Sequence, residues 1–166
     1  MFAAATDLPL LADPELDLMF ERTIDIAPEL VWKAWTEPAH LMPWFCPLPW
    51  RTTECEIDLR PGGKFRTVMV GPAGERHDNI GCYLEVTENR QLVWTSALGP
   101  GFRPTGNTFM TAIIRLEPVA QGTRYMALAR HMDAATRQQH EAMGFREGWG
   151  TALDQLVAYM KQQAAS

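Results

Sequence analysis

The C-terminal segment 133–161 constrains the fold more than any other stretch, because its apolar residues recur every three or four positions. This spacing predicts an amphipathic helix of several turns with a broad apolar face. The apolar face consists of Phe145, Trp149, Leu153, Leu156, Val157 and Met160, and the opposite face carries Arg146, Glu147, Asp154, Gln155 and Lys161. A helix this apolar on one side needs a large surface to pack against, so we expect the rest of the chain to form that surface.

Two local signals mark the start of this helix and its irregularities. Asp133 is a suitable N-cap, because its carboxylate can accept hydrogen bonds from the unpaired N–H groups of the first turn. Gly144, Gly148 and Gly150 interrupt the pattern, and each weakens a helix interior by roughly 1 kcal/mol relative to alanine. We interpret these glycines either as a bend or as places where the helix backbone approaches a neighbour closely.

Short strand patterns fill the middle of the chain, separated by turns rich in glycine and proline. The first strand is predicted over 18–26. Pro28 then opens a helix that ends before Pro38, and a further helical turn covers 39–42. Six more strands are predicted over 52–59, 65–70, 79–86, 91–96, 108–117 and 123–132. Strands joined by short turns form an antiparallel sheet, and helices gathered on one side of it make the fold class α+β.

The two-residue period of the strands predicts which side chains face the core. In 52–59, Thr53, Cys55 and Ile57 are expected on one face, opposite three acidic residues. For the strand 79–86 the pattern does not show which residues point into the core, because apolar residues occupy both of its faces. A β-bulge would reconcile the two patterns.

The composition limits the possible classes of function. The 166 residues carry a net charge of −5 and no basic run, which disfavours nucleic-acid binding. No stretch is long enough to span a bilayer, so we expect a cytoplasmic protein. We also expect a loose N-terminal arm over 1–17, followed by a single domain over 18–163. Cys46, Cys55 and Cys82 lack the spacing of metal ligands, so we expect free thiols, no metal and no cofactor.

Several ordered motifs resemble a known family. They are Ala27-Pro28-Glu29-Leu30-Val31-Trp32, Asp58-Leu59-Arg60-Pro61-Gly62-Gly63-Lys64-Phe65, Gly81-Cys82-Tyr83-Leu84-Glu85-Val86 and Gly144-Phe145-Arg146-Glu147-Gly148-Trp149. Together they are similar to the START-like, Bet v 1-like (SRPBCC) superfamily, and most of all to its branch named after the activator of the Hsp90 ATPase. The resemblance implies a helix-grip fold, in which a curved antiparallel sheet surrounds a long C-terminal helix and two short helices lie between the first two strands. It also implies a cavity between sheet and helix that takes a hydrophobic ligand.

Ten residues are expected to line that cavity. They lie in the proline-rich loop 43–50, on the sheet and on the C-terminal helix: Trp44, Trp50, Met69, Tyr83, Trp94, Met110, His131, Phe145, Trp149 and Leu153. A ligand site is mostly apolar with a few polar groups that orient the ligand, and methionine thioethers adapt to irregular contents. The alternative is that these side chains simply fill a close-packed core.

His131 is the polar residue of this set with the widest chemistry. Pointing inward at the end of the last strand, it would hydrogen-bond a ligand or shuttle a proton near neutral pH. The alternative is a structural histidine whose hydrogen bonds are satisfied within the protein. His40, His77 and His140 are expected on the surface or in loops.

Three functional hypotheses follow from the resemblance and from these residues. The first is a binding protein for a small hydrophobic or aromatic molecule. The second is an enzyme of cyclase, aromatase or hydrolase type, in which the cavity orients a polyketide-like substrate and His131 does the acid–base work. The third is a cochaperone of the Hsp90 type. We expect no nucleic acid and no membrane as partners, and the aromatic loop could seal a homodimer as easily as gate a pocket.

Overall fold

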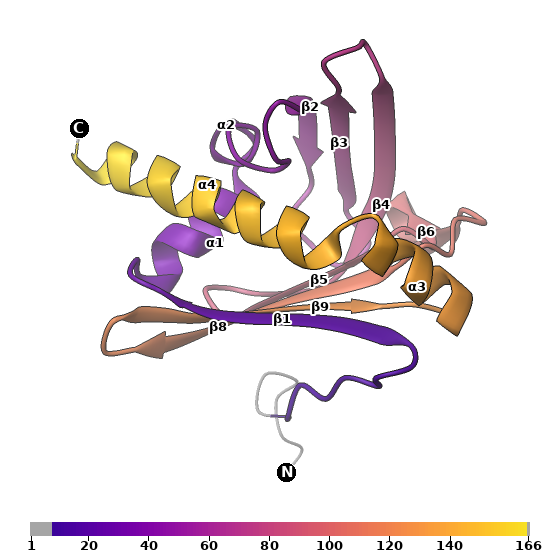
Figure 1. Cartoon of the computed structure of the whole chain (residues 1–166), viewed down its shortest axis with the longest axis horizontal. Coiled ribbons are helices and arrows are strands. Elements are labelled where there is room, and N and C mark those ends of the chain that lie inside the picture. Colours follow the sequence, from indigo (N-terminus) through magenta and orange to yellow (C-terminus); the bar gives the residue numbers. More distant parts are fainter. Residues whose placement is uncertain (1–7, 166) are drawn as a thin grey trace.

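The structure, a computed structural model, describes residues 8–165 and shows a seven-stranded antiparallel sheet curved around a long C-terminal helix (Figure 1). The sheet consists of β1 (Asp17–Ile24), β9 (Gly122–Arg130), β8 (Thr111–Val119), β5 (Gln91–Thr95), β4 (Arg76–Thr87), β3 (Lys64–Val70) and β2 (Arg51–Ile57), given in spatial order. Two further strands, β6 (Leu98–Gly99) and β7 (Arg103–Pro104), pair around the 3-10 turn η2 (Pro100–Phe102). These last three elements lie between the predicted strands 91–96 and 108–117, where the sequence predicted no helix or strand.

The helices lie on the concave side of the sheet (Figure 1). They are α1 (Pro28–Thr36), α2 (Pro38–Leu41), α3 (Ala134–Ala142) and α4 (Phe145–Ala165). The predicted α+β helix-grip fold is therefore confirmed, including the two short helices between the first two strands. Within residues 8–165, no helix has the length and apolar character that crossing a membrane requires.

The predicted apolar face of α4 is the face that packs against the core. Four of its residues are buried and two are half-buried: Phe145, Leu153, Leu156 and Met160, then Trp149 and Val157. Two ion pairs hold the outer side of α4. Asp154 pairs with Arg22 on β1, and Lys161 pairs with Asp25, which directly follows β1.

The C-terminal segment forms two helices rather than one. Gly144 separates α3 from α4 and has a φ of 90°, a conformation that favours glycine because it has no side chain. Gly150 is a place where the helix backbone approaches a neighbour closely, since a Cβ at this position would lie 3.1 Å from Nη2 of Arg22. The N-cap prediction is confirmed, because the Asp133 carboxylate accepts a hydrogen bond from the Thr136 N–H at 2.8 Å.

Two irregularities in strand pairing decide which residues face the core. In β2 the pairing shifts between Thr52 and Glu54, so Thr52 is buried and Thr53 is exposed. The prediction that Thr53 shares the face of Cys55 is therefore wrong. In β4 the pairing shifts between Tyr83 and Glu85, which is the irregularity that the mixed pattern of this strand required.

The described part of the predicted arm 1–17 is bound to the sheet rather than loose, and its last residue, Asp17, already belongs to β1. Three of its carbonyl oxygens, those of Leu8, Leu11 and Leu16, accept hydrogen bonds from the side chains of Arg115, Arg130 and His131. The remainder of the predicted arm, residues 1–7, lies outside the described residues.

Candidate functional site

An aromatic cluster lies in the interior between the sheet and the helices. It consists of Trp35, Trp44, Phe45, Phe65, Tyr83 and Trp94. The Trp35 ring on α1 lies 4.9 Å from the Trp44 ring and 5.2 Å from the Trp94 ring, centroid to centroid. Phe65 on β3 stacks on Tyr83 of β4 at 5.2 Å with an angle of 13° between the rings. The sequence identified Trp44, Tyr83 and Trp94 of this cluster as site residues.

Two buried polar groups of this cluster, the Tyr83 hydroxyl and Trp35 Nε1, lack a hydrogen-bond partner among the described residues. The Tyr83 side chain is 0% exposed. Burial raises the pKa of Tyr83, so the hydroxyl stays protonated and remains a donor at neutral pH. A buried donor without an acceptor costs about 1–3 kcal/mol, so most proteins avoid it. The hydroxyl is therefore available to a molecule that brings an acceptor.

Four other predicted site residues lie in or against the same interior. Leu153 belongs to the core that contains the aromatic cluster. Phe145 belongs to a smaller core beside it, with Leu18 and Ala129. Met110 and Trp149 are half-buried and pack against both cores. These two side chains therefore lie at the junction between the two cores.

Trp50 and Met69 are not brought to this interior. The Trp50 ring contacts the ring of His77 at 5.2 Å, and His77 on β4 is paired in register with Met69 on β3. Neither Trp50 nor Met69 belongs to the two apolar cores. They lie near the end of β3 that faces away from the aromatic cluster, since Phe65 is at the start of that strand.

A histidine pair, His131 and His140, lies beside the smaller core. His131 Nε2 and His140 Nδ1 are 2.8 Å apart, and both side chains are buried. The other ring nitrogen of His131, Nδ1, must carry a proton because it donates to the Leu16 carbonyl oxygen at 2.8 Å. Both ring nitrogens of His131 are thus engaged within the protein.

The environment of His140 keeps this residue neutral. The rings of Phe109, Phe145 and Trp149 surround it, at centroid distances of 4.7, 5.2 and 6.3 Å. Burial, together with repulsion from a positive charge on His131, lowers the pKa of His140 to about 4. The prediction that His140 lies on the surface or in a loop is wrong. His77 is exposed on β4, and His40 on α2 is half-buried with Nδ1 2.9 Å from the Tyr159 hydroxyl.

Gln155 fixes the proline-rich loop 43–50 to α4. Its Nε2 donates hydrogen bonds to the carbonyl oxygens of Trp44 at 3.1 Å and Cys46 at 2.9 Å, and its Oε1 accepts one from the Leu48 N–H at 3.0 Å. The helical period placed Gln155 on the polar face but gave no sign of this contact. The loop, which could gate a pocket according to the sequence analysis, is therefore held against the helix.

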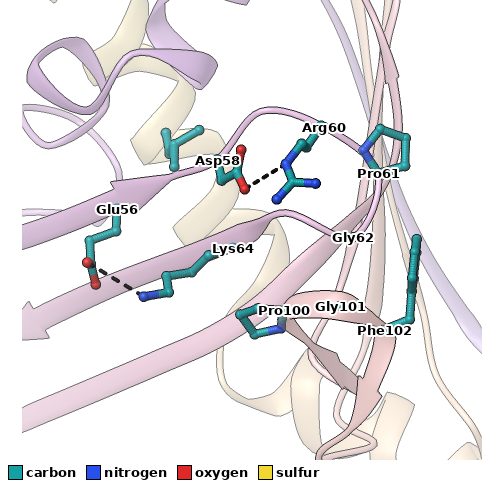
Figure 2. Close-up of a pocket in the computed structure, with 10 residues that line it drawn as sticks. Glu56, Asp58, Arg60, Pro61, Gly62, Lys64, Pro100, Gly101 and Phe102 are labelled. Atoms are coloured by element: carbon teal, nitrogen blue, oxygen red, sulfur yellow. Dashed lines mark hydrogen bonds and ion pairs between the residues drawn. The ribbon is translucent and has the colours of Figure 1, made fainter.

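A surface hollow with a volume of about 460 Å³ lies at the end of the β2–β3 hairpin (Figure 2). It is lined by Glu56, Ile57, Asp58, Arg60, Pro61, Gly62, Lys64, Pro100, Gly101 and Phe102. None of the ten predicted site residues lines it.

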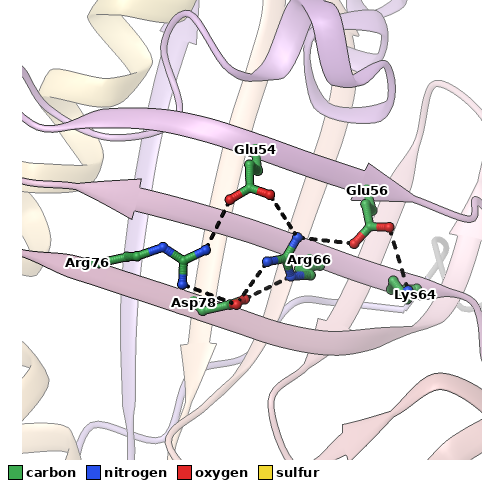
Figure 3. Close-up of polar contacts among 6 residues, drawn as sticks. All are labelled: Glu54, Glu56, Lys64, Arg66, Arg76 and Asp78. Atoms are coloured by element: carbon green, nitrogen blue, oxygen red, sulfur yellow. Dashed lines mark hydrogen bonds and ion pairs between the residues drawn. The ribbon is translucent and has the colours of Figure 1, made fainter.

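An ion-pair network covers the outer face of β2, β3 and β4 (Figure 3). Its centre is Arg66, whose Nε and Nη2 donate to the Asp78 carboxylate, each at 2.9 Å, while Nη1 reaches Glu54 and Glu56 on β2. Arg66 points outward, whereas its neighbour Phe65 on the same strand is buried in the core. The network joins three strands on the face opposite the aromatic cluster.

Other chemistry has few candidates in the described part of the chain. Among residues 8–165, no group of three or more His, Cys, Asp or Glu side chains is arranged to hold a metal ion. Cys46 and Cys82 are buried, Cys55 is half-buried, and all three are free thiols. Burial raises the pKa of Cys55 to about 11, so its thiol stays protonated at neutral pH.

The sequence matches a protein-family model over most of its length. Residues 25–161 match the model described as Activator of Hsp90 ATPase homolog 1-like protein. The chain belongs to this family. The resemblance to the AHSA1-like branch of the START-like, Bet v 1-like superfamily is thereby confirmed, and the matched range contains both the aromatic cluster and the histidine pair.

Solved structures resemble this AHSA1-like chain along nearly its whole length. A protein of Nitrosomonas europaea is 49% identical and superposes with a TM-score of 0.91, covering 93% of this chain and 100% of its own. A protein of Rhodobacter sphaeroides is 23% identical with a TM-score of 0.77, covering 89% and 93%. An AHSA1-like protein of Aeromonas hydrophila is 21% identical with a TM-score of 0.71, covering 91% and 96%. The last two show the shared fold alone. A comparison with curated proteins finds no match.

Proposed function

We propose that this AHSA1-like protein binds a small hydrophobic or aromatic molecule, carrying a hydrogen-bond acceptor, in the interior between the sheet and α4. The observation that carries the proposal is the buried Tyr83 hydroxyl, which has no hydrogen-bond partner among the described residues. An acceptor oxygen of the ligand beside this hydroxyl would offset a cost of about 1–3 kcal/mol that the ligand-free protein bears.

The surroundings of the hydroxyl support a ligand of this class. The rings of Phe65, Trp94 and their neighbours offer apolar surface and edges for offset or T-shaped contacts with an aromatic ligand. Met110 and Trp149 would act as the movable side chains, because both are half-buried at the junction of the two cores. A flexible thioether at this position adapts to a ligand with little loss of packing.

Native mass spectrometry of freshly purified protein tests the proposal directly, because it detects a molecule that copurifies with the chain. The same spectrum gives the subunit count, which tests whether the chain forms a homodimer. A panel of aromatic ketones and phenols is then compared with hydrocarbons of matched size by thermal unfolding. A ligand that binds only the folded state raises the melting temperature, and the acceptor-bearing compounds should raise it most.

The Tyr83→Phe variant separates the hydroxyl from the ring. Without ligand it should be more stable than the wild type by about 1 kcal/mol or more, because the unpaired donor is gone. Its affinity for acceptor-bearing compounds should fall about tenfold, while affinity for the matched hydrocarbons stays the same. Tyr159→Phe is the control, because the hydroxyl of Tyr159 lies 2.9 Å from Nδ1 of His40 and its loss should not stabilise the protein.

The result that would overturn the proposal is a wild-type protein that carries no copurified molecule and gains no stability from any compound of the panel. Turnover of a bound compound would instead support the enzyme hypothesis. His131 is the residue expected to do acid–base work in that case, yet its ring nitrogens already bind the Leu16 carbonyl and His140.

A further inference from the structure

The hollow at the end of the β2–β3 hairpin is formed by backbone that is firmly held. The hairpin turn is closed by hydrogen bonds from the Arg60 N–H to the Asp58 carbonyl and from the Gly63 N–H to the Arg60 carbonyl, each of 2.8 Å. The η2 turn is fixed to this hairpin by the Gly101 N–H, which donates to the Gly62 carbonyl at 2.8 Å. Two segments that lie about forty residues apart in the sequence therefore form the walls of one hollow (Figure 2).

Phe102 is held at the edge of this hollow in an unfavourable conformation. Its φ is 64°, which for a residue other than glycine is a sparsely populated region that requires support from the surroundings. The Phe102 ring lies directly over Gly62, because a Cβ at Gly62 would be only 2.7 Å from the ring atom Cε2. Half of the Phe102 side chain is nevertheless exposed to solvent. Backbone strain of this kind, which leaves an aromatic ring exposed, is typical of a binding position.

The charged groups around the hollow keep unused hydrogen-bonding capacity. Arg60 uses only Nε, which donates to the Asp58 carboxylate at 2.8 Å, so its two terminal nitrogens have no partner among the described residues. Figure 2 shows the Arg60 guanidinium beside the Asp58 carboxylate, inside the arch of the hairpin turn. Lys64 Nζ lies 3.7 Å from a Glu56 oxygen, which is an ion pair without a hydrogen bond. Exposed pairs of this kind contribute little stability, so a ligand can compete for their partners.

We propose that this hollow binds a small zwitterion that carries an aromatic ring, as an aromatic amino acid does. Two positive and two negative side chains line it, so the site is neutral and suits a ligand with one charge of each sign. The ligand carboxylate pairs with the two free terminal nitrogens of Arg60, a geometry that a guanidinium offers and an ammonium does not. The ligand ammonium binds the carboxylates of Asp58 and Glu56, and its ring packs against Phe102. The volume of about 460 Å³ is in the range of small-molecule sites.

Three probes with the same ring test this charge pattern. Phenylalanine carries both charges, 3-phenylpropionate only the carboxylate, and phenethylamine only the ammonium. Each is added to nitrogen-15-labelled protein while the amide signals of Gly62 and Gly101 are followed by NMR. Phenylalanine should bind most tightly, and each singly charged probe should bind about tenfold more weakly, because one charged contact is lost.

Two variants locate the contacts. Arg60→Gln should weaken phenylalanine binding about tenfold and leave phenethylamine unaffected, whereas Arg90→Gln, outside the hollow, is the control with the same change of charge. Phe102→Gly removes the ring while accepting the positive φ, and it should weaken all three probes.

The interior site gives an independent control, because Tyr83→Phe should bind phenylalanine as the wild type does. The proposal is overturned if phenylalanine leaves the Gly62 and Gly101 signals unchanged at millimolar concentration. It is also overturned if Arg60→Gln binds phenylalanine as well as Arg90→Gln does, or if the shifted signals belong to the aromatic cluster. The first two outcomes do not bear on the interior ligand, whereas shifted signals in the aromatic cluster would overturn this proposal and support the interior one.

Discussion

Acidification should destabilise this protein at a pH well above the range in which its carboxylates titrate, and His140 should be the cause. In the folded protein, the pKa of His140 is about 4, whereas an unfolded histidine has a pKa of about 6.5. Between these two values the unfolded chain binds the additional proton and the folded protein does not. Stability therefore increases with pH across this window and falls as the solution becomes more acidic.

The size of the effect follows from the two pKa values. The free energy of unfolding should decrease by roughly 2 kcal/mol at pH 5 and by roughly 3 kcal/mol at pH 4, relative to pH 8. Hydrogen bonds and ion pairs lower the pKa of Asp25, Asp78 and Asp133 below the usual value of 3.8. Their contributions are lost only as the pH falls through and below that value. The interval from about pH 6.5 to about pH 4 therefore reports on His140.

Urea denaturation at a series of pH values measures this dependence. His140→Gln removes the titrating ring and keeps an N–H donor for His131, so its stability should change much less between pH 7 and pH 4. His77→Gln also removes one histidine, but an exposed one, and should keep the wild-type pH dependence. A wild-type protein that is equally stable at pH 5 and pH 7, or a His140→Gln variant with the wild-type slope, would refute the reasoning.

Three further predictions follow from single contacts in the structure. Gly144→Ala should lower the free energy of unfolding by about 1 kcal/mol because the φ of Gly144 is 90°, whereas Gly148→Ala, which has room for a Cβ in the helix, should raise it by up to about 1 kcal/mol. Urea denaturation measures both changes, and changes of the same sign would contradict the assignment of the bend to Gly144. Gln155→Ala removes three hydrogen bonds and should cost about 2 kcal/mol while exposing the loop 43–50 to proteases; an unchanged cleavage rate would show that the loop is held otherwise. Arg66→Gln should reduce the dependence of stability on salt in a sodium chloride titration, and an unchanged dependence would count against the ion-pair network.

The C-terminal helix could be predicted because its signals are local. The apolar period of α4, the cap at Asp133 and the break at Gly144 each depend on residues within a few positions of one another. The family resemblance supplied the curvature of the sheet and the placement of α4 on it, which no periodicity contains. The matched range of 25–161 explains why this inference succeeded.

The burial of His140 could not be predicted from its own segment. α3 is mostly polar, and the residues that cover His140 come from elsewhere: Phe109 from the chain before β8, and His131 from the chain after β9. Only the tertiary fold brings these residues together. Gln155 was missed for the same reason, because the loop that it binds is more than one hundred residues away in the sequence.

The predicted site residues were chosen by residue type and by facing, and neither property tells where along a strand a side chain lies. Trp50 and Met69 are apolar as expected but lie near His77, away from the aromatic cluster. Thr53 shows a second limit, because one extra residue in β2 reverses the facing of the residues before it. The ten-residue site therefore stays a prediction.

The double hydrogen bond at Leu16 matters to anyone who alters the beginning of the chain. The Leu16 carbonyl oxygen accepts from both the backbone N–H and the Nδ1–H of His131, at 3.1 and 2.8 Å. That oxygen thereby selects the His131 tautomer, which leaves Nε2 as the acceptor for His140 when both rings are neutral. A protein trimmed to begin at β1, or an affinity tag fused close to Leu16, would therefore disturb the contact between His131 and His140. Because His140 lies on α3, a change near the beginning of the chain would weaken the packing of a helix that lies more than one hundred residues later.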